Sequence, residues 1–182
     1  YRDGIDLTAS DFYQRLPHSN VLPTTSQPSV GDFEKIYREL ADQGASGIIS
    51  IHLSTGISGT VNSATLAAQQ ISSIPVEVID TRCAGAMHML AVEAGARAIA
   101  AGADLKGAVA AVNQVIEAQR TVFTVDTLEY LYKGGRIGGA AALLGSMLQF
   151  KPLLYFREGK IDALERVRKS SRALQRMVEV MA

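Results

Sequence analysis

The sequence predicts an α/β fold of two α/β domains, the first of which is a mostly parallel sheet flanked by helices. Segments with helical spacing of apolar residues alternate with short apolar segments of strand length. The segment 47–53 is apolar on both faces, which is typical of a strand in a covered parallel sheet. This alternation changes after Arg120, so we expect the domains to span residues 1–119 and 120–182.

Two capping patterns, each a hydroxyl residue followed three positions later by an acidic one, predict the first two helices. They start at Thr8 and at Ser29. Apolar residues at helical spacing follow the second pattern: Phe33, Ile36, Tyr37 and Leu40. The later elements of the first domain are expected at 47–53 (strand), 60–71 (helix), 76–79 (strand), 84–101 (helix) and after Asp104 (helix).

The second domain is expected to begin with a strand and to contain a hairpin. A glycine-rich segment at 134–139 is predicted to be flexible, and Glu158-Gly159 is predicted to be the turn between two strands. The expected elements are, in order, a strand at 121–125, a helical turn at 128–132, a helix of small residues at 140–148, strands at 152–156 and 160–167, and a helix from Ser170.

Composition excludes several classes of protein. The 182 residues include 18 basic and 18 acidic side chains, so a zero net charge gives no support for nucleic-acid binding. The longest apolar runs are too short to span a bilayer, and we expect at most transient membrane contact. The single cysteine, Cys83, excludes an intrachain disulfide and fits the reducing cytoplasm.

Two loops rich in hydroxyl residues precede predicted helices. The first, at residues 24–29, reads TTSQPS, and the second, at residues 54–60, reads STGISGT and follows an apolar strand. A helix N-terminus offers unpaired NH groups and a partial positive charge, and the glycines permit close backbone approach. An anion such as a phosphate or a carboxylate fits such a site. The same residues are equally typical of a turn with a helix cap.

Four motifs in order along the chain resemble the DegV family of bacterial fatty-acid-binding proteins. They are TSQPS at 25–29, ISGTVNSA at 57–64, DTLEYLYKGGRIG at 126–138 and KPLLYFREGKI at 151–161. The resemblance implies two α/β domains with one long-chain fatty acid between them and no other cofactor. It also implies a fatty acid kinase as partner, which phosphorylates the carboxylate for phospholipid metabolism.

The resemblance implies particular ligand-binding residues. Thr25 and Ser58 correspond to the carboxylate ligands, and their two hydroxyl groups are expected to share one pocket. Their near neighbours are Ser26, Gly59 and Thr60, and Arg136, in the flexible glycine-rich segment, is added to the expected ligand-binding set on its charge. On the residues alone, Arg136 could bind an anion or be an ordinary surface arginine.

Two family segments have no counterpart in this sequence: the opening strand with its Asp-Ser-Thr-like end, and a His-Thr-Gly-Pro-Gly-like segment near the end. We therefore expect the chain to be the middle of a longer protein. Several residues near the inferred cleft are expected to face the acyl chain, with ordinary core packing as the alternative for each one singly, and replacing Leu144 by Trp is expected to shorten the chain that is accepted. The expected residues are Ile57, Met87, Leu90, Leu144 and Phe150.

The principal alternative is an enzyme that acts on a small phosphorylated or keto substrate at the same loops. The sequence has no acid–base pair or metal-ligand cluster at motif spacing, which favours a lipid-binding carrier without catalysis. A DNA-binding regulator is a weaker alternative because the chain is neutral and lacks a helix-turn-helix pattern. We interpret His52 and Cys83 as structural residues.

Overall fold

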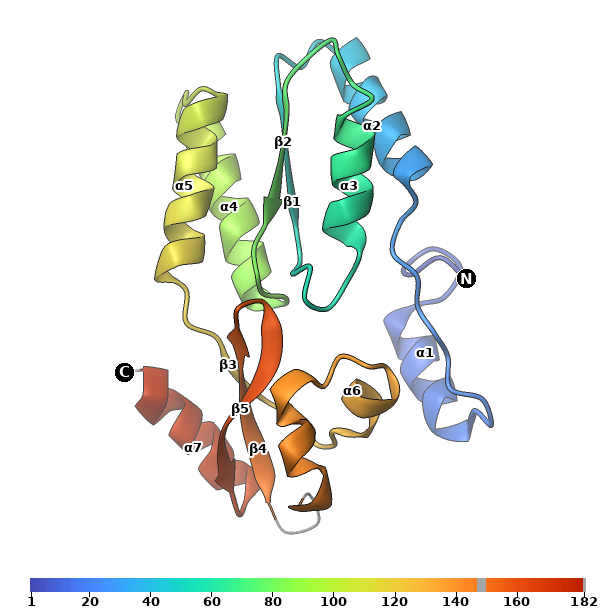
Figure 1. Ribbon diagram of the computed structural model, residues 1–182, viewed down its shortest axis with the longest axis vertical. Coiled ribbons are helices and arrows are strands. Elements are labelled where there is room, and N and C mark those ends of the chain that lie inside the picture. Colours follow the sequence, from blue (N-terminus) through green and yellow to red (C-terminus); the bar gives the residue numbers. More distant parts are fainter. Residues whose placement is uncertain (147–149, 182) are drawn as a thin grey trace.

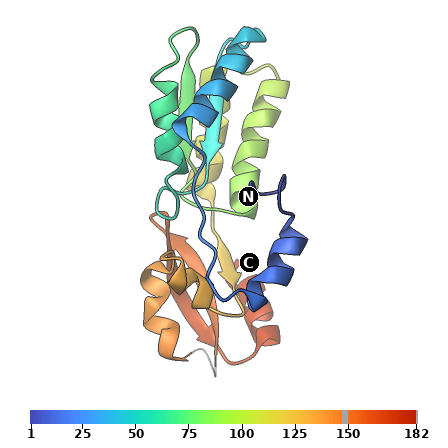
Figure 2. The same cartoon turned by 90° about the vertical axis from the view of Figure 1, so that its right-hand side faces the viewer.

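The computed structural model describes residues 1–146 and 150–181, which form an N-terminal arm and two units (Figure 1). The arm contains a short helix, α1 (Ala9–Arg15), and a 3₁₀ turn, η1 (Leu16–His18). It then runs without helix or strand from the level of the second unit to the first helix of the first unit (Figure 2).

The first unit is a two-stranded parallel sheet with helices on both faces (Figure 1). Ile48 of β1 pairs with Val76 of β2, and His52 pairs with Asp80. Side chains alternate along β1, so that Ile48 packs under α2 and α3 while Ile49 packs under α4 and α5. The elements are α2 (Val30–Asp42), β1 (Ile48–His52), α3 (Thr60–Ala68), β2 (Val76–Asp80), α4 (Ala86–Ala100) and α5 (Leu105–Ala118).

The second unit is a three-stranded antiparallel sheet in the order β3-β4-β5. Helix α7 packs on one face of the sheet, and the segment containing α6 and η2 packs on the other. A two-residue turn joins β4 to β5, and both of its residues, Glu158 and Gly159, have positive φ. The elements are β3 (Val122–Thr124), α6 (Glu129–Lys133), η2 (Gly138–Ser146), β4 (Lys151–Arg157), β5 (Lys160–Val167) and α7 (Ser170–Met181).

The predicted fold class is confirmed, because a parallel sheet flanked by helices forms the first unit. The capping box at Ser29 is also confirmed in both of its halves, with Asp32 as the reciprocal partner. The predicted apolar stripe of α2 is only half covered. Tyr37 is 2% exposed, but Ile36 is 50% exposed, because it lies to one side of the face that contacts the sheet.

The predicted small-residue helix at 140–148 is the clearest difference. The chain forms a 3₁₀ helix from Gly138 to Ser146 instead, and residues 147–148 lie outside the described residues. This segment packs closely on β5, where a Cβ atom on Gly138 would collide with the carbonyl of Ile161. No helix in the described ranges is both long and apolar enough to cross a membrane.

Candidate functional site

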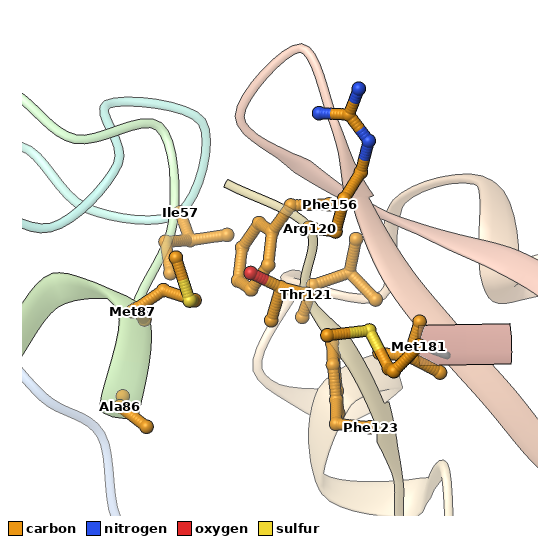
Figure 3. A pocket seen from close by; sticks show the side chains of 12 residues that line it. Ile57, Ala86, Met87, Arg120, Thr121, Phe123, Phe156 and Met181 are labelled. Atoms are coloured by element: carbon orange, nitrogen blue, oxygen red, sulfur yellow. The ribbon is translucent and has the colours of Figure 1, made fainter. Parts of the chain in front are cut away.

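A pocket of about 530 Å³ lies between the two units. This volume falls within the range of about 300–1,000 Å³ that is usual for small-molecule sites. Ile57 and Met87 come from the first unit and lie opposite Phe156 of the second (Figure 3). The lining is mostly apolar and consists of Ile57, Ala84, Gly85, Ala86, Met87, Arg120, Thr121, Val122, Phe123, Phe156, Ile161 and Met181.

The expected lipid-facing residues divide into two groups. Ile57 and Met87 line this pocket, whereas the other three are not among its lining residues. Leu90 is 41% exposed on α4. Leu144 packs against the core beneath η2, and the guanidinium of Arg168 lies 5.9 Å from the centre of the Phe150 ring. The pocket wall is supplied instead by aromatic side chains of the second sheet.

The loop 54–60 joins β1 to α3 beside this pocket. Ser54 is fully buried, and its carbonyl oxygen accepts hydrogen bonds from the amides of Ile57 (3.2 Å) and Ser58 (3.1 Å). The Ser58 and Thr60 hydroxyl oxygens are 2.8 Å apart, and the Thr60 amide donates to the Ser58 hydroxyl at 3.3 Å. Gly59 is the N-cap residue of α3, and no side chain caps this helix. The loop therefore presents hydroxyl groups at the N-terminus of α3, where the N-cap glycine has no side chain and Ser58 accepts from the first helical amide.

The first hydroxyl loop approaches the second through Gln27. A Cβ atom on Gly59 would lie 2.8 Å from the Gln27 side-chain nitrogen, so the backbone at Gly59 is in close contact with that amide. Thr25 and Ser26 are exposed, and their hydroxyl groups have no hydrogen-bond partner among residues 1–146 and 150–181. Both are free to bind a ligand.

Arg136 reaches the loop 54–60 from the second unit. Its Nε donates to the carbonyl of Ile57 at 3.1 Å, and its Nη1 donates to the carbonyl of Gly134 at 2.5 Å. Within the described part of the chain, no carboxylate forms an ion pair with this guanidinium. A positive charge without a protein counterion is thus fixed next to Ser58, which favours an anionic ligand there.

His52 belongs to a hydrogen-bonded network at the end of β1. Its Nε2 lies 2.6 Å from the Ser50 hydroxyl, which lies 2.6 Å from the hydroxyl of Tyr37. Burial lowers the pKa of His52, with a smaller contribution from His88, and burial also lowers the pKa of His88. Both imidazoles therefore favour the neutral form.

Cys83 is fully buried, and burial raises the pKa of its thiol. Its place before α4 therefore does not activate it. Among residues 1–146 and 150–181, no group of three or more His, Cys, Asp or Glu side chains is arranged to hold a metal ion.

Sequence reasoning missed Ser54 and Gln27 as contributors to this site, although both lie inside the hydroxyl loops. It also missed Gly159, whose carbonyl oxygen accepts a hydrogen bond from the Ser54 hydroxyl at 2.6 Å across 105 positions of sequence. The available signal for Ser54 was a Ser at the end of an apolar strand, two positions before Gly56. No local pattern could have paired it with the β4–β5 turn.

Comparisons with known proteins agree with this architecture. The profile of a family described as "Uncharacterised protein, DegV family" matches residues 1–182. A DegV domain-containing protein of Listeria monocytogenes is 39% identical over 182 residues, which are 100% of this chain and 64% of that protein. The chain thus spans less than two thirds of the length of that relative.

Solved structures described as fatty-acid-binding proteins have the same fold. A DegV family protein from Thermus thermophilus, described by its fatty acid binding, has a TM-score of 0.91 and 37% identity, over 100% of this chain and 64% of that one. A stearic acid-binding protein from Eubacterium ventriosum has a TM-score of 0.88 and 29% identity, over 100% and 63%. From the profile match over its whole length and from these relatives, we conclude that the chain belongs to the DegV family.

Proposed function

We propose that this protein binds one long-chain fatty acid, with the acyl chain in the pocket between the two units and the carboxylate at the loop 54–60. The adjacency of Ile57 and Ser58 carries this proposal. The Ile57 side chain lines the apolar pocket, and the next residue begins the group of hydroxyl donors. A ligand that is apolar along its length and anionic at one end matches this arrangement.

The head group needs donors of its own for energetic reasons. Burying about fourteen methylenes at ~0.8 kcal/mol each removes on the order of 11 kcal/mol of unfavourable hydration. A bilayer offers the acyl chain similar burial, so the protein must add affinity at the carboxylate. Each charge-assisted hydrogen bond to a carboxylate contributes roughly 1.5–3 kcal/mol, which is large enough to favour the protein.

The proposed head-group site is centred on the N-terminus of α3. Ser58 and Thr60 supply hydroxyl groups there, and Arg136 supplies a positive charge without a counterion in the described part of the chain. The first hydroxyl loop contacts Gly59 through Gln27, and its Thr25 and Ser26 hydroxyls are the further proposed donors. The full proposed set is Thr25, Ser26, Ser58, Gly59, Thr60 and Arg136.

We extend the proposal to a partner. Thr25 and Ser26 are exposed, so a carboxylate bound beside them would be reachable from outside the protein. A fatty acid kinase could then phosphorylate it to an acyl phosphate for phospholipid metabolism, in the cytoplasm. In this proposal the chain presents the substrate, catalyses no step itself and requires no cofactor other than the bound fatty acid.

Variants of the two hydroxyl donors test the head-group site. Thr25→Val and Ser58→Ala should each weaken the binding of a long-chain fatty acid by roughly 1.5–3 kcal/mol, about tenfold or more, because each removes one donor to the carboxylate. Titration calorimetry with the acid and with its methyl ester measures this, and the ester should show a smaller loss. Ser72→Ala, at an exposed position before β2, is the matched control. Equal binding of acid and ester by the unmutated protein would refute the proposal.

Substitutions in the pocket test where the acyl chain lies. Met87 lines the pocket and Leu144 does not, so Met87→Trp should shorten the accepted chain, whereas Leu144→Trp should act on the core of the second unit. This placement revises the expectation for Leu144. Native mass spectrometry of the retained fatty acids gives the chain-length profile, and an unchanged profile for Met87→Trp would contradict the placement.

A further inference from the structure

Every polar atom of Ser54 is used in a hydrogen bond. Its amide donates to the carbonyl of Cys83 at 2.9 Å, and its carbonyl accepts the two loop amides described above. Its hydroxyl accepts from the amide of Gly56 at 3.1 Å and donates to the carbonyl of Gly159 at 2.6 Å. One buried side chain thus joins the hydroxyl loop of the first unit to the β4–β5 turn of the second.

Two glycines make this contact between the units possible. A Cβ atom on Gly56 would collide with the carbonyl of Gly159, and a Cβ atom on Gly159 would lie 2.5 Å from the Ser54 hydroxyl. Gly159 also has a φ of +78°, which other residues rarely adopt. The two backbones therefore approach as closely as glycine allows, and the Ser54 hydroxyl occupies the remaining space.

We infer that Ser54 is a positioning residue that couples recognition of the carboxylate to the contact between the loop 54–60 and the β4–β5 turn. This inference rests on the proposed function, because the groups that Ser54 positions are the proposed carboxylate donors. The same β4–β5 hairpin supplies Phe156 and Ile161 to the pocket wall. This contact, together with the hydrogen bond from Arg136 to the Ile57 carbonyl, therefore sets the head-group loop and the apolar wall relative to each other.

Removing the Ser54 hydroxyl should disrupt this coupling and leave the fold of the loop intact. In Ser54→Ala the carbonyl of residue 54 still accepts from Ile57 and Ser58, so the turn before α3 is retained. Only the bonds to Gly56 and Gly159 are lost. We therefore expect the loop to persist but to be less well fixed against the second unit, which lowers the fit of its donors to a carboxylate.

The test measures the ratio of acid to methyl ester affinity for one long-chain fatty acid. Ser54→Ala should weaken acid binding by about two- to tenfold, as expected for one hydrogen bond, and ester binding by less than about twofold. Gly56→Ala should lower the same ratio by a second route, because its methyl group would displace the β4–β5 turn from the loop. A variant that was merely destabilised would lose affinity for both ligands equally.

Thr55→Ala is the matched control, because Thr55 lies in the same loop but is exposed and bonds Asp80 rather than the second unit. It should leave the ratio unchanged. A normal ratio in both Ser54→Ala and Gly56→Ala, or an equal loss in Thr55→Ala, would overturn the inference while leaving the proposed function intact. Equal acid and ester binding by the unmutated protein would instead refute the proposed function.

Discussion

The two hydroxyl loops have similar compositions and the same position before a helix, but their side chains have different environments. In the first loop, residues 24–29, every side chain is exposed. Its bonded hydroxyl belongs to Ser29, which accepts from the amide of Asp32 at 3.1 Å and so caps α2. The first loop therefore uses its local hydrogen bonding to start a helix.

The second loop, residues 54–60, is bonded across the molecule. Ser54 and Thr60 are buried, and the loop contacts the second unit at two points, through the Ser54 hydroxyl and the Ile57 carbonyl. The N-cap residue of helix α3, Gly59, gives no side-chain cap. A hydroxyl-rich loop before a helix is therefore held in one position only where another part of the chain packs against it.

The largest effect should come from breaking the contact between the units. Gly159→Ala combines a strained φ with a collision at the Ser54 hydroxyl, and should lower the free energy of unfolding by about 2–3 kcal/mol. Gly44→Ala, just after α2, has the same strain at φ +90° but no atom within 4 Å, and should cost about 1–2 kcal/mol. Urea denaturation measures both. Equal losses would show that the collision with Ser54 contributes nothing.

A smaller effect should distinguish the capping role of Ser29 from the proposed ligand-binding role of Ser58. Ser29→Ala removes the cap of α2 and should lower the free energy of unfolding by about 1 kcal/mol, with fatty-acid binding unchanged. Ser58→Ala should mainly weaken fatty-acid binding and cost less stability than Ser29→Ala, because the N-cap residue of α3 is Gly59 and the Ser58 hydroxyl accepts only one long hydrogen bond from the helix, at 3.3 Å from the Thr60 amide. Denaturation and ligand titration on the same two variants check this. Loss of binding in Ser29→Ala would show that the first loop is more than a cap.

The smallest effect should be a difference in acid sensitivity. Burial lowers the pKa of His52 from 6.5, so the stability that the neutral imidazole provides is complete above about pH 6.5 and is lost as the pH falls toward the lowered pKa. Hydrogen bonds from Ser29 lower the pKa of Asp32 from 3.8, so that contribution is lost only below about pH 3.8. The network of His52, Ser50 and Tyr37, which joins β1 to α2, should therefore weaken before the cap of α2 on acidification.

Hydrogen exchange of the amides of Asp32 and Ser50, followed from pH 7 downward, would separate the two windows of acid sensitivity. A His52→Gln variant should remove the upper window because it has no titrating imidazole. Simultaneous loss of protection at both amides would contradict the assignment of separate groups.

Much of the fold could be predicted from local patterns. The capping box of α2, the strands at Ile48 and Val76 and the hairpin turn at Glu158 follow from periodicity and turn chemistry, which act over a few residues. The 3₁₀ helix at Gly138–Ser146 did not follow, because close packing of Gly138 on β5 determines its geometry.

The α/β alternation and the family followed from the sequence alone, because these depend on residue type and spacing along the chain, and the same motifs supplied the proposed hydroxyl donors. Only the tertiary structure decided which loop is fixed. It joined Ser54 to Gly159 and placed Phe156 rather than Leu144 in the pocket wall. The physical reason is that close approach of two backbones depends on the space left by distant residues, and that space exists only after both units have folded.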